Sequence, residues 1–371
     1  MKYQDKARGM LVGLAVGDAL GAPVEFLPTP SDFYIKQQGE KIEHFHKNSR
    51  LPEGVWTDDT SMALCIADSL IANKGYDSYD IMRRFYEWCY SDYRKHPQAP
   101  LDVGNQTLRA LDKWEKSKTI PKNTEKTESA GNAPIMRLAP IIIANTFPNK
   151  NYPTLKDGYE SGSLVISPED ENSEFIDGKD IAPTLKMAEL SCRETHDSIA
   201  AITVTELFAT TLYSALHGLE KRNIINYASR WMKGEEYDEF WISNINDLTE
   251  RPLKRDENQF HNLGGYIVDT FAIALWGLQN FKNFKDGMMA VIRLGGDTDT
   301  NAACYGQLAG AYYGYEAIPK EWRKDVYLSD ELVKIADQLL EMDECVIKRT
   351  RFEDDEFFKP DNARPFPYLM V

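Results

Sequence analysis

Two acidic clusters lie near the two ends of the chain, and an apolar segment with helical spacing follows each of them. The first is Trp56-Thr57-Asp58-Asp59-Thr60, and the second is Gly295-Gly296-Asp297-Thr298-Asp299-Thr300. They offer hydroxyl and carboxylate oxygens but no histidine or cysteine. Oxygen ligands suit hard cations such as Mg²⁺ and Mn²⁺, whereas zinc prefers nitrogen and sulfur. We therefore expect two helix N-termini to converge on one cation or on two adjacent ones.

A plainer interpretation exists for each cluster. Asp and Thr are common at helix N-caps and first turns, where they accept hydrogen bonds from free backbone N–H groups. A Thr-Asp-Asp-Thr run standing alone would more often be such a cap than a set of ligands. The second cluster favours the metal, because several carboxylates at buried helix starts repel one another unless a cation neutralises them.

Glycine recurs every fourth position at the start of the chain, at Gly9, Gly13, Gly17 and Gly21. Helical spacing places these residues on one stripe, although each glycine costs a helix about 1 kcal/mol relative to alanine. Such a stripe indicates that another helix backbone approaches closely. The same spacing follows the second acidic cluster, at Ala302, Gly306, Gly310 and Gly314. We predict two small-faced helices packed together, each with acidic residues at one end.

Helical patterns dominate the rest of the chain, and alternating strand patterns are scarce. The helical ranges are 61–73, 78–90, 104–116, 134–144, 198–219, 265–278 and 284–292. They predict an all-α protein. No solenoid repeat or convincing linker divides the chain, so residues 1–371 are interpreted as one domain. Residues 149–180 are rich in Gly, Ser, Pro, Asp and Glu, which predicts an inserted surface loop with a short hairpin at 164–167.

Composition narrows the function classes. With 42% apolar residues the 371-residue chain can bury a large core, and its formal charge of -15 would repel nucleic acid and anionic membranes. Five widely spaced cysteines without a CxxC pair indicate reduced thiols in a cytoplasmic protein. We expect no secretory signal and no stretch long enough to span a bilayer. The absence of GxxxxGK[ST] and HExxH motifs argues against a P-loop nucleotidase and a zincin.

Seven motifs in a fixed order carry a resemblance to a known family. They are Gly13 to Phe26, Trp56 to Thr60, Asp102-Val103-Gly104-Asn105, Gly131 to Arg137, Thr195-His196, Gly264 to Thr270 and Gly295 to Thr300. In these motifs the chain resembles the ADP-ribosylglycohydrolases, a family that includes dinitrogenase reductase-activating glycohydrolases and ADP-ribosylarginine hydrolases. Several motifs are weak individually, but all seven in order over nearly the whole length are specific.

The resemblance implies an all-helical fold with two Mg²⁺ or Mn²⁺ ions. It assigns the metal ligands to Thr57, Asp58, Asp59, Asp297, Asp299 and Thr300. In the family the metals engage the ribose hydroxyls beside the scissile bond and organise a water for attack at the anomeric carbon. The catalytic residues would be Glu25, Asp59, Asp102 and Asp299.

Glu25 and Asp102 each have an ordinary structural interpretation as well. Glu25 stands in a Pro-Val-Glu-Phe segment after the glycine helix, where a surface carboxylate at a helix end is equally expected without the resemblance. By the resemblance to the family, Glu25 is a candidate catalytic acid or base. Asp102 shortly precedes a helix that begins near Gly104, so it could be a plain N-cap. In arginine-directed members a carboxylate here faces the guanidinium group.

The resemblance also implies an ADP-ribose site made of Asp102, Gly131, Asn132, Met136, His196 and Tyr266. Backbone N–H groups at the Gly-Asn segment could hold pyrophosphate oxygens. Each of the other side chains has a plainer alternative. Met136 and Tyr266 could be ordinary core residues, and His196 could be bonded to a helix cap.

These observations favour hydrolysis of the N-glycosidic bond between ADP-ribose and a protein arginine, with Asp102 favouring arginine over serine. Two alternatives stay open: a hydrolase of O-linked or other ADP-ribose derivatives, and an immunity-type protein that neutralises an ADP-ribosyltransferase toxin by binding it. A complete set of metal carboxylates argues against a purely non-catalytic role, because buried like charges are costly without the ion. The expected partner is an ADP-ribosylated protein, the transferase is a second candidate, and the chain is expected to be a monomer.

Overall fold

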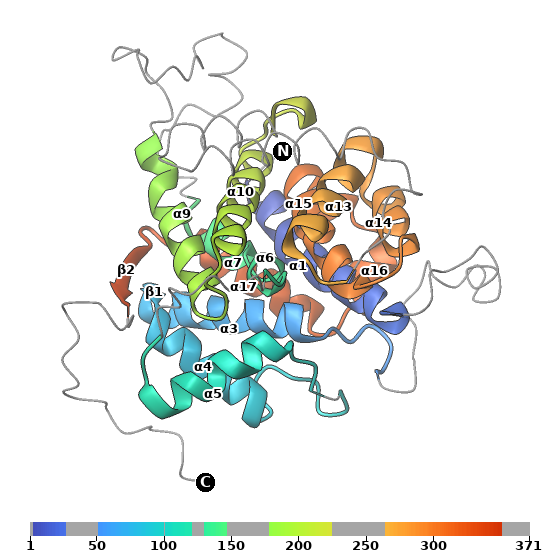
Figure 1. The fold of residues 1–371 in the computed structure, drawn as a ribbon. Helices are drawn as coiled ribbons and strands as arrows, with labels where there is room; N and C mark the ends of the chain where they lie inside the picture. The colour runs from blue at the N-terminus through green and yellow to red at the C-terminus, as the bar shows by residue number, and fades with distance from the viewer. Residues whose placement is uncertain are drawn as a thin grey trace, which may run out of the picture.

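Helices make up nearly all of the regular structure in the residues that the computed structural model describes, which are 3–26, 51–99, 101–120, 130–146, 178–224 and 264–350 (Figure 1). The prediction of an all-α fold is confirmed. The elements are α1 (Tyr3–Gly21), the 3₁₀ turn η1 (Ala22–Val24), α3 (Asp58–Asn73), β1 (Gly75–Asp77), α4 (Ser78–Tyr90), α5 (Asn105–Ser117), α6 (Ala133–Met136), α7 (Ala139–Ala144), α9 (Gly178–Arg193), α10 (Ile199–Leu216), α13 (Ile267–Asn280), α14 (Phe284–Arg293), α15 (Thr298–Tyr313), the 3₁₀ turn η4 (Tyr315–Ala317), α16 (Lys320–Asp325), α17 (Ser329–Leu340) and β2 (Val346–Arg349).

Helices α1 and α15 form the centre of the fold and run in opposite directions with their backbones in contact. A Cβ atom added at Gly13 would lie 2.3 Å from the carbonyl oxygen of Gly306, and one added at Gly310 would lie 1.9 Å from that of Gly9. The predicted packing of two small-faced helices is therefore confirmed. Because the helices are antiparallel, the C-terminal end of α1 meets the N-terminal end of α15, where the second acidic cluster lies.

The other helices surround this pair. Helices α13 and α14 pack on α15, α17 packs on α1, and α10 packs on α9 and α15. In Figure 1, α3, α4 and α5 lie at the bottom of the view and α13 and α14 lie at the upper right. One cluster of buried apolar side chains runs through the described elements from α1 to α17. This shared core holds the two acidic helix starts in fixed positions relative to each other.

Most of the predicted helices are present, and α4 has the predicted bounds. The predicted helix at 134–144 is instead two helices, α6 and α7, separated at Arg137 and Leu138. The break has a physical cause, because Pro140 has no N–H group and its ring would clash with the carbonyl four residues earlier. This break gives Arg137 a non-helical backbone at a buried position.

Helices α9, α16 and α17 were not predicted. Helix α9 begins at Gly178, so the predicted insertion at 149–180 extends three residues too far. Glycine, aspartate and an internal Pro183 gave this segment the composition of a loop, whereas its packing on α10 supports a helix. The predicted hairpin at 164–167 lies outside the described residues.

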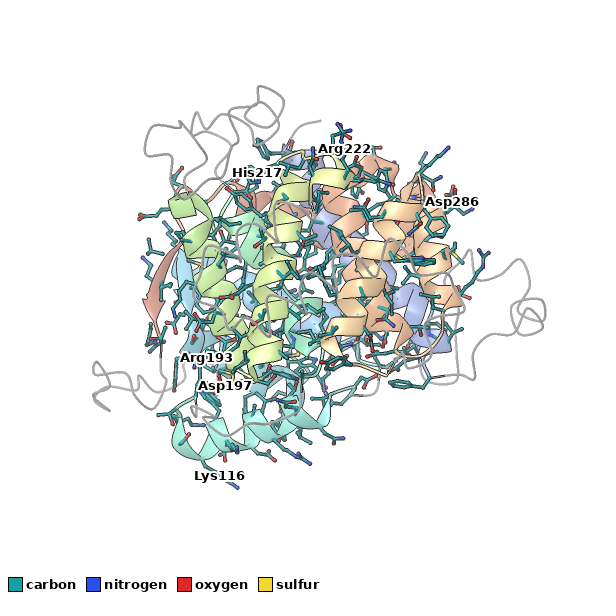
Figure 2. The ribbon with its side chains drawn as sticks, turned by 45° about the horizontal axis from the view of Figure 1, so that its top comes forward. Lys116, Arg193, Asp197, His217, Arg222 and Asp286 are labelled. Atoms are coloured by element: carbon teal, nitrogen blue, oxygen red, sulfur yellow. The ribbon has the colours of Figure 1, made fainter. Side chains whose placement is uncertain are left out.

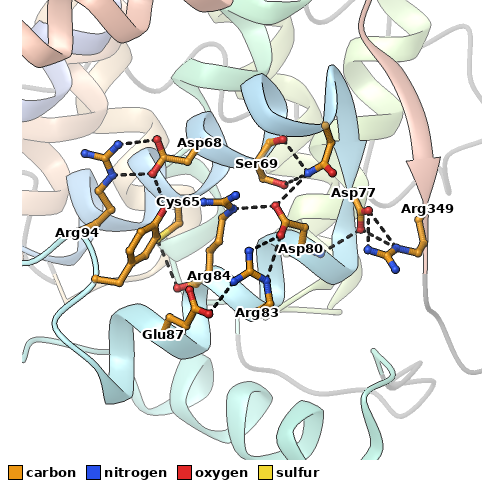
Figure 3. A network of polar contacts seen from close by, with 12 residues as sticks. Cys65, Asp68, Ser69, Asp77, Asp80, Arg83, Arg84, Glu87, Arg94 and Arg349 are labelled. Atoms are coloured by element: carbon orange, nitrogen blue, oxygen red, sulfur yellow. Dashed lines mark hydrogen bonds and ion pairs between the residues drawn. The ribbon is translucent and has the colours of Figure 1, made fainter. Parts of the chain in front are cut away.

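Strands β1 and β2 form a short parallel pair that joins distant parts of the chain, with Gly75 opposite Val346. Arg349 makes an ion pair with Asp77 at 2.7 Å, and the carboxylate of Asp77 also caps α4. Figure 3 shows that this pair borders a wider polar network around α3 and α4. In that network the guanidinium group of Arg94 binds Asp68 at 2.6 Å, which fastens the segment after α4 to α3.

Two helical stretches, Tyr3–Val24 and Ile199–Leu216, are long and apolar enough to cross a membrane by length and composition alone. The expectation that no stretch has this length was therefore wrong, because interruptions by glycine, threonine and Asp18 concealed it in the sequence. In both stretches 83% of the apolar window is buried inside the fold. Burial in the helical core accounts for their apolar composition.

Candidate active site

The N-terminus of α3 is capped by a buried carboxylate from another helix. Asp18 of α1 is fully buried and accepts hydrogen bonds from the backbone N–H of Thr57 at 2.8 Å and of Thr60 at 3.0 Å. It also accepts from both threonine hydroxyls, at 2.8 and 2.7 Å. Thr57, the N-cap residue, makes no side-chain cap bond to its own helix. The first acidic cluster is thus not needed as a helix cap.

Sequence reasoning gave Asp18 no role, although a signal was present. A carboxylate in the middle of an apolar glycine stripe must be buried, and a buried carboxylate needs hydrogen-bond donors. Its donors, Thr57 and Thr60, come from a segment about forty residues away, so the sequence did not identify them. Asp18 connects the glycine helix to the first acidic cluster.

The second acidic cluster starts at a tight turn before α15. Gly295 and Gly296 have φ angles of 78° and 76°, a left-handed conformation that favours glycine. The backbone N–H of Phe26 donates to the carbonyl of Gly296 at 2.7 Å, which holds the segment after η1 against this turn. As a result, carboxylate oxygens of Glu25, Asp297 and Asp299 all lie within 4.8 Å of one another.

The carboxylates of the two clusters also influence one another. Burial, followed by the charges of Asp102, Asp18 and Asp297, raises the pKa of Asp58 well above its usual value. Burial is likewise the main cause of the raised pKa of Asp59 and Asp299, with neighbouring carboxylates adding to it. Carboxylates of the two acidic clusters therefore lie close enough to influence one another, and Asp18 of α1, which was not among the predicted site residues, lies with them.

The arrangement fits a hard divalent cation. The Oδ1 atom of Asp59 is buried and has no hydrogen-bond partner within the described part of the chain. The amide of Asn132 donates to Asp297 at 2.8 Å and to Thr270 at 3.0 Å, which fixes one oxygen of Asp297. A buried carboxylate oxygen without a donor is costly, and a bound cation would remove that cost. The clustered groups offer oxygen atoms as metal ligands, and such ligands suit Mg²⁺ or Mn²⁺.

The remaining residues predicted around the metal lie at the edge of this cluster. The Thr57 hydroxyl is 3.3 Å from Oδ2 of Asp59, while Thr300 is buried and its N–H donates to Asp299 at 2.8 Å. Asp102 is exposed, and it is not the N-cap of α5, since that position is taken by Gly104. After burial, the charge of Asp102 is the largest cause of the raised pKa of Asp58, so this exposed carboxylate lies near Asp58.

A turn formed by two separate segments adjoins the acidic cluster. Gly131 pairs with Tyr266 in an antiparallel bridge, and the N–H of Asn132 donates to the carbonyl of Gly265 at 3.1 Å. A Cβ atom at Gly265 would lie 3.1 Å from Oδ2 of Asp297. A Cβ atom at Gly131 would lie 2.8 Å from Nε2 of His196. The turn therefore stands between the carboxylates and His196.

Apart from Asp102, the residues predicted to bind ADP-ribose fall into two groups. Gly131, Asn132, His196 and Tyr266 lie together at this turn, and Tyr266 is 44% exposed, so its side chain is not part of the core. Met136 is 2% exposed and belongs to the core cluster. The first group is the one that the structure brings together at the turn.

His196 lies in the turn between α9 and α10. Arg193 and Asp197 make an ion pair at 3.0 Å across this turn, and Figure 2 shows the two side chains close together. The N-cap of α10 is Ser198, whose hydroxyl accepts from the N–H of Ala201 at 3.2 Å. Burial, helped by the charge of Arg137, lowers the pKa of His196 to about 3. The imidazole is therefore neutral at physiological pH.

Comparison with known proteins agrees with this geometry. The sequence pattern of the ADP-ribosylglycohydrolase family matches residues 1–163 and 175–346. The chain belongs to the ADP-ribosylglycohydrolase family. Residues 164–174, which separate the two matched ranges, fall within the predicted insertion.

Two relatives match nearly the whole length of this chain. It is 30% identical over 337 residues to "ADP-ribosylarginine hydrolase Tri1" of Pseudomonas putida strain GB-1, covering 91% of this chain and 78% of the relative. It is 28% identical over 350 residues to the "ADP-ribosyl-[dinitrogen reductase] glycohydrolase" of Rhodospirillum rubrum, covering 91% and 96%. A solved "ADP-ribosylglycohydrolase-related protein complex" matches with a TM-score of 0.67 and 31% identity over 92% of this chain and 99% of the other.

Family membership and these relatives support an ADP-ribosylglycohydrolase activity for the chain. The fold of the solved relative is the all-helical fold described above. The acidic cluster is a candidate metal-binding group.

Proposed function

We propose that this protein removes ADP-ribose from arginine side chains of proteins by metal-dependent hydrolysis of the N-glycosidic bond. The observation that carries the proposal is the convergence of carboxylates from α3, α15, Glu25 and Asp102 beside the Gly131–Asn132 turn. The naming of a 30% identical relative as an ADP-ribosylarginine hydrolase supports the choice of arginine.

Two Mg²⁺ or Mn²⁺ ions are the proposed cofactors. Their ligands would be Thr57, Asp58, Asp59, Asp297, Asp299 and Thr300. When bound, these ions would supply Lewis acidity and lower the pKa of a water molecule. The carboxylates of this set are buried or half-buried, which supports their need for a counter-charge.

The chain's own residues orient the substrate and move the proton. The turn at Gly131 and Asn132, with His196 and Tyr266, would hold ADP-ribose, and the exposed Asp102 would accept hydrogen bonds from the guanidinium group. The water oxygen bonds to the anomeric carbon as the carbon–nitrogen bond breaks, and the arginine nitrogen takes up a proton. Glu25, which is half-buried beside Asp297 and Asp299, would relay that proton.

The first test is release of ADP-ribose from an arginine-ADP-ribosylated protein in Mg²⁺, Mn²⁺ or EDTA. We expect release with metal, none with EDTA, and a loss of at least about 100-fold in Asp299→Ala, because that variant lacks a central carboxylate. Absence of release with either metal would refute the proposed reaction.

The arginine preference has its own test. Asp102→Ala should lower cleavage of arginine-linked ADP-ribose by at least about tenfold while sparing serine-linked ADP-ribose, because only arginine offers a cationic leaving group. Equal losses on both linkages would contradict the assignment of Asp102. Faster cleavage of the serine linkage by the wild type would favour an O-linked substrate.

We place this reaction in the cytoplasm, in a monomeric single-domain protein. The five cysteines are buried and form no disulfide, as the sequence predicted, which supports a reducing compartment. The core shared by the described helices supports one domain. The modified protein is the proposed partner.

A further inference from the structure

A buried arginine lies behind the proposed ADP-ribose site and is linked to His196 through one hydroxyl. Arg137 is fully buried at the break between α6 and α7, with its guanidinium carbon 4.8 Å from the centre of the Phe85 ring. Its Nη2 donates to the carbonyl of Ser191 at 2.6 Å and to the Thr195 hydroxyl at 2.8 Å. The same Thr195 oxygen lies 2.9 Å from Nδ1 of His196.

The available protons determine which group donates in each hydrogen bond from Arg137 through Thr195 to His196. A guanidinium group can only donate, and its two Nη2 hydrogens are used by Ser191 and Thr195. The Thr195 hydroxyl therefore accepts from Arg137 and has its own proton left to donate. Within the described part of the chain, the acceptor in reach of that proton is Nδ1 of His196. An imidazole that accepts at Nδ1 carries its proton on Nε2.

The Nε2 edge of the ring faces the substrate turn. His196 is 3% exposed, and no hydrogen bond to its Nε2 occurs among the described residues. A Cβ atom added at Gly131 would lie only 2.8 Å from Nε2 of His196, so a side chain at this position would cover the Nε2 edge of the ring. The Nε2–H group is therefore left to donate to an acceptor oxygen on a ligand at this turn.

We propose that Arg137 and Thr195 are positioning residues that hold His196 with its proton on Nε2, as a fixed hydrogen-bond donor to an oxygen of ADP-ribose at the Gly131–Asn132 turn. This inference rests on the proposed function for its ligand, but the tautomer itself is a property of the free protein. Burial keeps the His196 ring neutral, so the ring carries a single N–H group. Arg137 and the Thr195 hydroxyl determine which ring nitrogen holds that proton.

The tautomer can be measured without any activity. Two-dimensional ¹H–¹⁵N NMR of ¹⁵N-histidine-labelled protein distinguishes the two ring nitrogens, and the His196 signals are assigned by their loss in His196→Gln. We expect an unprotonated Nδ1 and a protonated Nε2 in the wild type and in Thr195→Ser, which keeps the hydroxyl. Thr195→Val should populate the other tautomer. A proton on Nδ1 in the wild type, or an unchanged tautomer in Thr195→Val, would overturn the proposal.

Binding of free ADP-ribose, measured by titration calorimetry with Mg²⁺ present, gives the second readout. Thr195→Val should bind about tenfold more weakly than the wild type, which corresponds to one lost hydrogen bond, and Thr195→Ser should stay within about twofold. Equal affinity of all three proteins would refute the donor role. If the wild type shows the expected tautomer but binds no ADP-ribose, the proposed function fails while the positioning of His196 stands.

Discussion

At the scale of single residues, Asp59 is the carboxylate whose position most requires a metal. It is fully buried, and its Oδ1 has no partner in the described part of the chain. We predict that Mg²⁺ at about 100 times its Kd stabilises the wild type by about 2.7 kcal/mol, whereas Asp59→Asn gains little. In EDTA the variant should be the more stable protein, because it lacks a buried charge that burial makes costly.

Urea unfolding with Mg²⁺ or EDTA measures both effects. Asp92→Asn is a matched control, since it removes a carboxylate that is 89% exposed. The control should gain as much from Mg²⁺ as the wild type does. A full Mg²⁺ gain in Asp59→Asn would show that this carboxylate is not a ligand.

His196 gives a prediction on pH at the same scale. The folded state holds its pKa at about 3, so between about pH 6.5 and 3 the unfolded chain binds a proton that the folded one does not. Stability therefore falls as pH falls through this window. From pH 7.5 to 5 in EDTA, the wild type should lose about 2 kcal/mol more than His196→Gln. If urea unfolding gives the same loss of stability between the two pH values for both proteins, the burial of a neutral imidazole is contradicted.

At the scale of elements, the contact of α1 with α15 depends on the absence of side chains. Gly13→Ala would place a Cβ atom 2.3 Å from the Gly306 carbonyl oxygen, so the two backbones must separate. We expect a loss of about 3 kcal/mol in the free energy of unfolding, despite the better helix propensity of alanine. Because Asp18 is on α1 and Asp299 is on α15, the variant should also lose activity.

Gly104→Ala is the control for this substitution. A Cβ atom at Gly104 would meet nothing within 4 Å, and the φ angle there is -63°. Only the residue preference at the N-cap of α5 changes, so the loss in the free energy of unfolding should stay within about 1 kcal/mol. Chemical denaturation of both variants decides the matter, and similar losses for the two would mean that the helix contact is not the cause.

At the scale of the whole molecule, the charge of -15 favours basic partners. With Mg²⁺ held constant, kcat/KM for an arginine-ADP-ribosylated basic protein should fall several-fold when NaCl rises from about 20 mM to about 300 mM, because salt screens long-range attraction. A small ADP-ribosyl-arginine conjugate should respond less. The same salt dependence for both substrates, measured by initial rates, would argue against steering by the net charge.

Local patterns in the sequence determined much of this protein. The glycine stripes predicted the contact of α1 with α15, and periodic apolar residues predicted α4 and most other helices, because helical spacing and small-residue packing are properties of short segments. The two acidic clusters were predicted to form one candidate metal site, because several carboxylates at buried helix starts repel one another unless a cation neutralises them. The sequence also predicted free cysteines, and all five are buried and unpaired.

Tertiary structure decided which residues partner one another. The donors to Asp18, the fixing of Asp297 by Asn132 and the link from Arg137 to His196 join residues far apart in the chain. No local pattern encodes such pairs, because a buried polar group needs a partner but does not specify which segment provides it. The break after α6 and the helix α9 depended likewise on packing that overrides local composition. The sequence thus supplied the reactive groups, and the fold determined their neighbours.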